Sequence, residues 1–307
     1  MIPCVADCGP TDAPDPSPPF PALNDPEGER LPDDLPPVVD AHVHLFDDAT
    51  FAKIWHWFEH HGWPIRYPLR SPRVIDFLRD RGVSRIVGLC YSHRPGLSRP
   101  MNRYMASLQD ANPEFLLGLA TVLPGEEGAG DIVREAFALG LRGIKLHCHV
   151  QGFSPDDPRL GPIWEACVEA DKPVVMHAGR EPRAEGYRFD SYQLCRVDRT
   201  EAVLRNYPGL RLVVPHMGID ELDGYARLLE KYENLWLDTT MVLARYFPFD
   251  VPESMLRSRP DRILYGTDFP NLPYAWDREI RGIAGMNLGE DALAAMVGGN
   301  ASALYGL

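Results

Sequence analysis

The sequence has no uninterrupted apolar run that approaches the roughly 18 residues needed to cross a bilayer, and it has no cluster of basic residues. Lysine and arginine total 31 against 44 aspartate and glutamate residues, so the formal net charge is -13. A protein needs a basic face to bind nucleic acid or an anionic membrane surface. We therefore expect a small-molecule substrate, with neither nucleic acid nor a membrane as partner.

Three other features are missing. The first ten residues, MIPCVADCGP, lack the basic start and apolar core of a secretory signal, which predicts a cytoplasmic protein. The six cysteines are scattered without the spacing of a disulfide framework, so we expect reduced thiols. No glycine-rich phosphate loop follows the first predicted strand, which argues against an open nucleotide-binding sheet.

Proline is abundant and is concentrated at the N-terminus. Residues 1–36 are crowded with proline and acidic residues, a composition that disfavours a regular helix or a paired strand. We expect this segment to be an arm outside a single folded domain at 37–307. The arm would wrap the bottom of that domain or a partner subunit, and a homodimer formed by arm exchange is one hypothesis.

Beyond the arm, short apolar segments alternate with longer amphipathic ones, the pattern of βα units with a parallel sheet. Each apolar segment is continuous, as in strands that are buried on both faces. The eight candidate strands are 38–44, 85–90, 115–120, 143–147, 173–177, 211–216, 235–238 and 262–266. The intervening helices include 71–82, 130–140, 163–171, 200–209 and 221–234. Eight units predict an α/β protein with a closed (β/α)8 TIM barrel, which typically needs about 250 residues.

The first connection, residues 45–70, is rich in aromatic residues and is far longer than a usual βα loop. Such loops lie at the C-terminal face of a barrel, where active sites are built, so we expect this insertion to roof a pocket. Its aromatic residues are expected mainly to form the core of a small helical insertion, with pocket lining as a second role for one or two of them. They are Trp55, Trp57, Phe58 and Trp63.

Polar residues capable of binding a metal stand at the ends of four predicted strands. His42 and His44 are two residues apart on one strand, so their side chains leave on the same face, and paired imidazoles suit zinc and similar ions. His177 and His216 end the fifth and sixth strands, and Asp268 follows the eighth. A barrel brings these ends to one mouth, where buried, unpaired groups would be costly. Together they predict a metal-dependent active site.

The segments VDAHVH, GIKLH, VVMHAG, VVPHMG, LYGTDFP and GGNASALYGL occur in an order and spacing that resemble the amidohydrolase superfamily. The likeness covers residues 38–307 and is closer to the amidohydrolase-related branch of mononuclear metal hydrolases and decarboxylases. The resemblance implies that His216 works beside the metal-bound water or the substrate. It implies one divalent ion, usually zinc with manganese, iron or cobalt as alternatives, held by His42, His44, His177 and Asp268.

A divalent ion lowers the pKa of bound water towards about 7, and both Asp268 and His216 could accept its proton. We therefore expect hydrolysis of an amide, ester or lactone, with carboxylated compounds among the candidate substrates. The first alternative is non-oxidative decarboxylation of an aromatic or unsaturated acid by the same residues. The second is a non-catalytic barrel, which would have little reason to keep all five strand-end residues.

Substrate-binding candidates follow the fourth strand. Lys145 is expected to anchor a substrate carboxylate, and a structural ion-pair network is an equal alternative. In the dinuclear proteins that the chain resembles, a carbamylated lysine near this position bridges two metals, so that option stays open although one metal is favoured. His147 and His149 are candidate pocket residues.

Arginines in the loop after the fifth strand are further candidates. Arg180, together with Arg183 and Arg188, lies where a rigid guanidinium fork could hold an acidic substrate. Ordinary solvent-exposed surface is the alternative for all three.

Overall fold

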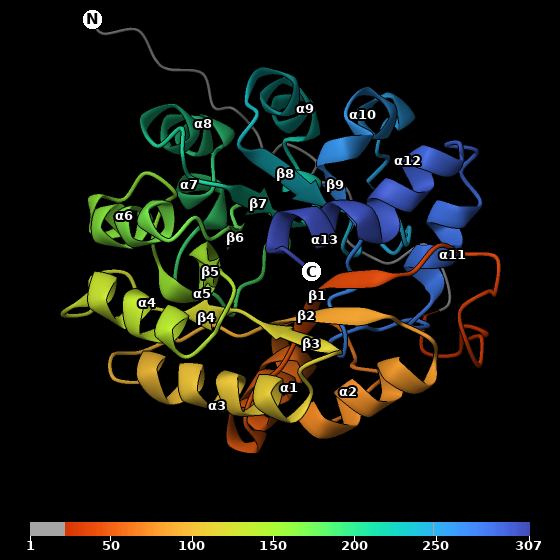
Figure 1. The fold of residues 1–307 in the computed structure, drawn as a ribbon, viewed down its shortest axis with the longest axis horizontal. Coiled ribbons are helices and arrows are strands. Elements are labelled where there is room, and N and C mark those ends of the chain that lie inside the picture. The colour runs from red at the N-terminus through yellow and green to blue at the C-terminus, as the bar shows by residue number, and fades with distance from the viewer. Residues whose placement is uncertain (1–21, 248) are drawn as a thin grey trace, which may run out of the picture.

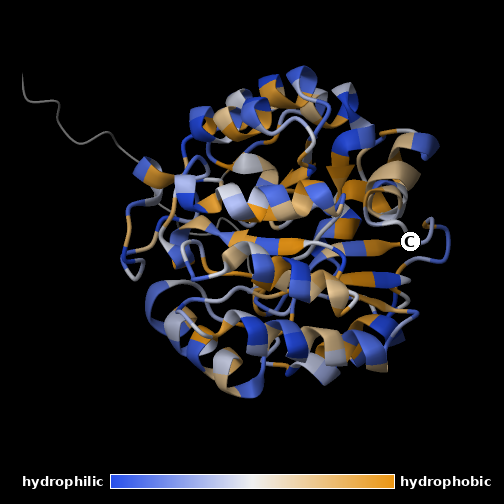
Figure 2. Ribbon diagram, turned by 60° about the vertical axis from the view of Figure 1, so that its left-hand side comes forward, coloured by the Kyte–Doolittle hydropathy of each residue, from blue (hydrophilic) through white to orange (hydrophobic). Residues whose placement is uncertain are grey.

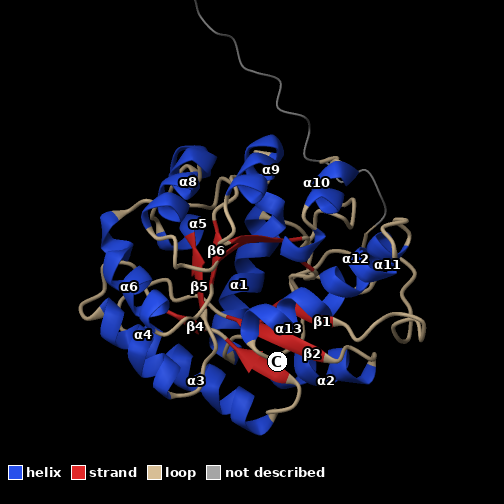
Figure 3. Cartoon of the chain, turned by 45° about the horizontal axis from the view of Figure 1, so that its top comes forward, coloured by secondary structure: helices blue, strands red, loops and turns tan. Residues whose placement is uncertain are grey.

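The computed structural model of the protein describes residues 22–247 and 249–307. A ring of parallel strands is surrounded by helices (Figures 1 and 3). The strands are β1 Val39–His44, β2 Arg85–Leu89, β3 Leu116–Gly118, β4 Ala120–Thr121, β5 Ile144–His147, β6 Val174–His177, β7 Leu212–Val214, β8 Leu235–Asp238 and β9 Ile263–Leu264. They lie at the eight predicted positions, with the third position divided into β3 and β4.

Backbone hydrogen bonds close the ring where the two sheets, β1–β3 and β4–β9, meet. At the division of the third strand, the Leu119 N–H donates to the Gly88 carbonyl at 2.9 Å. On the other side, the Ala41 N–H donates to the Tyr265 carbonyl at 2.9 Å. Strand ends therefore converge around one axis, and the predicted TIM barrel is confirmed.

The helices form the outer layer. They are α1 Asp48–His61, α2 Ser71–Asp80, α3 Ser98–Ala111, α4 Ala129–Ala138, α5 Cys148–Gln151, α6 Gly161–Glu169, α7 Ser191–Leu194, α8 Val197–Asn206, α9 Leu222–Lys231, α10 Glu253–Ser258, α11 Arg278–Ala284, α12 Glu290–Ala294 and α13 Asn300–Tyr305. The helices α2, α4, α6, α8 and α9 correspond to the five predicted amphipathic segments. In α2, for example, Val74, Ile75 and Leu78 form one buried face against the sheet.

The barrel is filled at one end by its own C-terminus. Interior side chains of the strands form one apolar cluster with Ala301, Leu304 and Tyr305 of α13, which lies over the centre of the ring in Figure 1. Arg211, just before β7, donates to the Leu304 carbonyl, so α13 covers the N-terminal ends of the strands. Figure 2 shows hydrophobic residues concentrated on the strands, beneath helices with hydrophilic outer faces. The opposite, C-terminal end is left for polar chemistry.

The described part of the N-terminal arm, residues 22–36, contains neither helix nor strand, as predicted. It packs along the flank of its own barrel between α2 and α11. There the Trp276 indole donates to the Gly28 carbonyl at 3.1 Å, and Arg278 pairs with Asp25 at 2.7 Å. Residues 1–21 lie outside the described residues, so arm exchange in a homodimer stays a prediction. Within the part of the chain that the structure describes, no helix is long and apolar enough to span a membrane.

Candidate active site

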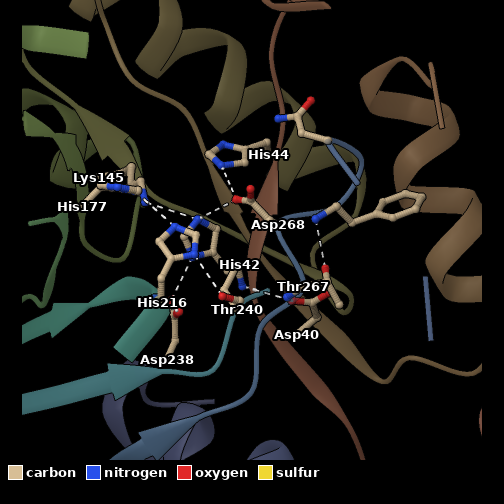
Figure 4. Close-up of polar contacts among 12 residues, drawn as sticks. Asp40, His42, His44, Lys145, His177, His216, Asp238, Thr240, Thr267 and Asp268 are labelled. Atoms are coloured by element: carbon tan, nitrogen blue, oxygen red, sulfur yellow. Dashed lines mark hydrogen bonds and ion pairs between the residues drawn. The ribbon is translucent and has the colours of Figure 1, made fainter. Parts of the chain in front are cut away.

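Three predicted donors converge at the C-terminal end of the barrel (Figure 4). His42 and His44 extend from β1, and Asp268 follows β9. The Nε2 atoms of the two imidazoles lie 3.2 Å and 2.9 Å from Asp268 Oδ1, and all three side chains are buried. One ligand atom from each lies within 4.8 Å of the others, so these residues can share one metal ion.

Asp238, at the end of β8, holds His42 in the orientation that a ligand needs. His42 Nδ1 donates to Asp238 Oδ2 at 2.8 Å, which leaves the lone pair on Nε2 directed towards Asp268. A carboxylate behind a metal-binding imidazole is a common arrangement that selects the tautomer and raises ligand basicity. Asp238 is not among the site residues predicted from the sequence. Its signal was an acidic residue at the end of an otherwise apolar strand.

Each residue of the segment Gly266–Asp268 has a structural role in directing the Asp268 carboxylate into the site. A Cβ on Gly266 would lie only 2.7 Å from the Cβ of His42, so only glycine allows this approach. The next residue, Thr267, donates its Oγ to Asp40 at 2.6 Å. Asp268 then adopts a left-handed φ of 72° while its N–H donates to the His42 carbonyl. An uncommon backbone conformation is thus kept by contacts that direct the carboxylate inward.

Burial alone would raise the pKa of Asp268, but the charge and hydrogen bond of His44, with His42 nearby, keep that pKa below its ordinary value. Burial lowers the pKa of His42 well below its ordinary value. The carboxylate is therefore ionised and the His42 imidazole neutral at neutral pH. These are the protonation states that metal ligands require.

His216 and His177 face each other beside this group. His216 Nδ1 donates to the Thr240 carbonyl at 2.9 Å, and His177 Nε2 donates to the Glu181 carbonyl at 3.1 Å. Because a carbonyl can only accept, the facing atoms, His216 Nε2 and His177 Nδ1, both carry lone pairs when the rings are neutral. They lie 3.1 Å apart, and burial lowers the pKa of both rings. This contact is favourable when a proton or a metal cation is held at these atoms.

His177 also belongs to a second buried group. Ligand atoms of His147, His149 and His177 lie within 4.8 Å of one another, and the rings of His147 and His177 stack with centroids 4.2 Å apart. The Nδ1 atoms of His147 and His149 are buried and have no hydrogen-bond partner among the described residues. The predicted four-ligand set is therefore divided in this structure, with three donors together and His177 in the neighbouring group.

Lys145 lies between the two groups. Its side chain is fully buried, its Nζ lies 3.3 Å from His42 Nε2, and it lines the cavity described below. Burial lowers the pKa of Lys145 to about 8. No carboxylate of the described residues forms an ion pair with Lys145, so the structural ion-pair network considered from the sequence is not observed among them.

The contacts of Arg180 do not support the substrate-binding role expected from the sequence. Its Nε donates to Asp220 Oδ1 at 2.6 Å, its guanidinium lies over the Tyr192 ring, and it does not line the cavity. Its charge is therefore compensated within the protein. Arg188, in the same loop, lines the cavity instead. Sequence alone could not separate the two, since the difference depends on where Asp220 lies after folding.

A cavity of about 300 Å³ opens above these residues, a size at the lower end for small-molecule sites. The insertion after β1 roofs it through α1, and the Trp57 ring lies 4.8 Å from Tyr187 on the opposite wall. Trp55 stacks on Phe51 in the core of the insertion, as predicted, whereas Trp57, Phe58 and Trp63 all line the cavity, so pocket lining falls on three of the four residues and not on one or two. The aromatic lining residues are Trp57, Phe58, Trp63, Tyr91, Tyr187 and Phe247.

Most ionisable side chains that line this cavity are basic residues or histidines. Asp268 is the only carboxylate among the described lining residues, whereas Lys53, Lys145 and Arg188 are basic. Six histidines also line it: His44, His93, His147, His149, His177 and His216. A divalent cation suits the buried nitrogen and oxygen donors at the base of the cavity. The remaining surface favours a planar, anionic molecule.

Known proteins share sequence features with the chain. The family model described as Amidohydrolase matches residues 39–307. A 2-amino-3-carboxymuconate-6-semialdehyde decarboxylase from Dictyostelium discoideum is 33% identical over 84 residues. That match covers 26% of this chain and 23% of the Dictyostelium protein, so the chain spans under a quarter of that relative's length.

Solved structures share the fold. An uncharacterised TIM-barrel protein from Bordetella bronchiseptica has a TM-score of 0.69 at 18% identity, covering 87% of this chain and 97% of that one. A 2,6-dihydroxybenzoate decarboxylase from Rhizobium has a TM-score of 0.64 at 16% identity, covering 89% and 99%. A manganese complex of 5-carboxyvanillate decarboxylase from Novosphingobium aromaticivorans has a TM-score of 0.62 at 18% identity, covering 92% and 99%.

Proposed function

The chain belongs to the amidohydrolase family, and we propose that it is a metal-dependent, non-oxidative decarboxylase of aromatic or unsaturated carboxylic acids. The observation that carries this proposal is the cavity, which combines aromatic walls and basic side chains above a cluster of metal-type donors, and that cluster holds the single carboxylate among the described lining residues, Asp268. From the sequence alone, hydrolysis is the first expectation and decarboxylation the second. Three of the four similar proteins named above are decarboxylases, which supports the second over the first.

The residues suited to hold the metal are His42, His44 and Asp268, with His177 as the fourth ligand that the family resemblance implies. A bound divalent ion would supply positive charge that stabilises the negative charge developing on the substrate. Zinc remains our expectation from the donor set, and manganese is the alternative, as in the structure of the Novosphingobium enzyme.

Lys145 is proposed to orient the carboxylate that leaves. Its buried ammonium group projects from β5 into the base of the cavity, beside His42. A charge-assisted hydrogen bond from this group would hold a carboxylate at the base, with the aromatic walls against the rest of the substrate. The Tyr91 and Tyr187 rings would exclude water from the reacting carbon.

His216 is proposed to supply the proton. When the bond between the carboxyl group and the substrate carbon breaks, carbon dioxide leaves, and the electron pair stays on that carbon and must be protonated. His216 can carry this proton only at Nε2, because Nδ1 already donates to Thr240. Burial lowers the pKa of His216, and the nearby carboxylates of Asp268 and Asp238 oppose that shift only in part. Transfer from Nε2 to carbon then completes the exchange of carbon dioxide for hydrogen.

The test is to incubate the metal-loaded protein with a panel of carboxyl-labelled aromatic and unsaturated acids, and separately with lactones, esters and amides. Labelled carbon dioxide, released in equal amount to the acid consumed, would support the proposal. Hydrolysis of a lactone, ester or amide without release of carbon dioxide from any acid would overturn it in favour of hydrolysis. The variant His216→Asn serves as the control for a contaminating enzyme, since its preparation should release almost none.

A further inference from the structure

The mouth of the cavity carries basic side chains whose charge the protein does not compensate. Lys53 of α1 and Arg188 of the loop after β6 both line the cavity and are exposed, as is His93 in the loop after β2. Neither Lys53 nor Arg188 forms an ion pair with a carboxylate of the described residues, although most arginines of the barrel, such as Arg259, are ion-paired. The chain as a whole has a net charge of -13, so this local excess of positive charge indicates a site for an anionic ligand.

Two separate segments bring these cations to one opening. Lys53 lies one helical turn before Trp57, whose ring packs against Tyr187, the neighbour of Arg188. Both cations therefore flank the point where α1 meets the loop after β6. A nearby carboxylate, Asp47, accepts hydrogen bonds from the backbone at the start of α1 and forms an ion pair with neither cation.

The mouth and the base of the cavity are distinct. His44, Lys145 and Asp268 at the base are at most 8% exposed, whereas Lys53 and Arg188 are open to solvent. Aromatic side chains line the space between these two ends. A ligand that uses the whole cavity would therefore have a flat, apolar body with a negative group at each end.

We propose that Lys53 and Arg188, with His93 beside them, form a second anion-binding subsite, and that the substrate is an aromatic or conjugated diacid. Which carboxylate leaves rests on the proposed function: the one at the base would depart as carbon dioxide, and the one at the mouth would remain on the product. An ammonium group and a guanidinium fork both donate charge-assisted hydrogen bonds to a carboxylate. Because both side chains are exposed, salt weakens this subsite.

Equilibrium binding of two probe acids tests the subsite without any requirement for catalysis. Titration calorimetry of the metal-loaded protein would compare terephthalate, with a carboxylate at each end of its ring, and benzoate, with one. We expect terephthalate to bind about tenfold more tightly, equivalent to about 1.4 kcal/mol. In the double variant Lys53→Met/Arg188→Met this preference should disappear, while the affinity for benzoate stays unchanged.

A matched control removes two positive charges elsewhere. Arg73 on α2 and Arg227 on α9 are exposed and do not line the cavity, so Arg73→Met/Arg227→Met should keep the tenfold preference. A wild-type protein that binds both acids equally would overturn the subsite. A preference that survives in Lys53→Met/Arg188→Met would overturn it as well.

The two proposals can fail separately. If the diacid preference depends on Lys53 and Arg188 but no acid releases carbon dioxide, the subsite stands and the decarboxylase assignment falls. If monoacids and diacids release carbon dioxide with equal kcat/KM, the decarboxylase assignment stands and the subsite falls.

Discussion

Two buried histidine groups lie side by side at the C-terminal end of this barrel, at the base of the cavity. They differ in how firmly hydrogen bonds hold their rings. In the β1 group, which consists of His42, His44 and Asp268, the carboxylate bonds to His44 and a second carboxylate, Asp238, fixes the tautomer of His42. In the β5 group, which consists of His147, His149 and His177, the rings bond to backbone carbonyls and to His216, and to no carboxylate of the described residues. Two of its rings keep a buried nitrogen without a hydrogen-bond partner among the described residues, against one, that of His44, in the β1 group. The β1 group is thus organised in advance, and the β5 group can adapt.

This difference has a chemical meaning. A metal ligand set gains affinity when its rings are already oriented, because less conformational freedom is lost on binding. Unpartnered imidazole nitrogens facing a cavity are costly unless they bind something there. We therefore assign metal binding chiefly to the β1 group and expect substrate contacts from His147 and His149.

The largest expected effect comes from breaking the β1 group itself. Asp268→Ala removes a ligand and the partner of His44, so we expect loss of the metal and a fall in turnover of more than about 100-fold. Elemental analysis and the carbon dioxide assay measure the two losses. Asp223→Ala, an exposed position on α9, is the control. Full metal content in Asp268→Ala would refute the assignment of this group.

His216→Asn separates proton transfer from metal binding. We expect turnover to fall by roughly 100- to 10,000-fold, the range for loss of a general acid, while most of the metal remains. The reason is that His216 lies beside the β1 group and is not a member of it. The same two assays apply. Metal loss equal to that of Asp268→Ala would mean that His216 is a ligand.

Asp238→Asn tests the role of ring orientation in the β1 group, because it leaves every proposed metal ligand in place. The amide cannot hold His42 Nδ1–H as strongly as the carboxylate does. Metal affinity should therefore fall by about 10- to 100-fold. Competition with a chelator of known affinity measures this change. An affinity within twofold of the wild type would show that orientation of His42 does not matter.

His149→Ala makes the matching change in the β5 group. Because the Nδ1 of His149 has no partner and its ring lines the cavity, we expect metal affinity to change less than about threefold, or about 0.7 kcal/mol. KM should rise instead. If metal affinity drops as far as in Asp238→Asn, His149 itself takes part in metal binding and the comparison fails.

The smallest effect is expected outside both groups. Arg180→Ala breaks a partly exposed ion pair with Asp220, which is worth about 1 kcal/mol or less. Its kcat and KM should match those of the wild type, and its unfolding midpoint in urea should shift slightly. A large rise in KM would restore the substrate-binding role expected from the sequence.

Much of the fold could be predicted because its signals are local. Buried parallel strands must be apolar throughout, so the strands were found at their eight positions, and the alternation of units implied the barrel. No feature of the sequence indicates the division of the third strand at Leu119, because that division depends on how neighbouring strands pair around the ring. The candidate ligands were found for a similar reason, since His42 and His44 stand at a strand end where a barrel places its active site.

The sequence by itself therefore determined the strands, the chemical character of the strand ends and the family. Tertiary structure decided which of these residues meet. The contacts of Asp268 with His44, Asp238 with His42 and Asp220 with Arg180 join residues 224, 196 and 40 positions apart. Hydrophobic periodicity describes only near neighbours along the chain, whereas the distance between remote side chains depends on how the closed ring and its loops pack.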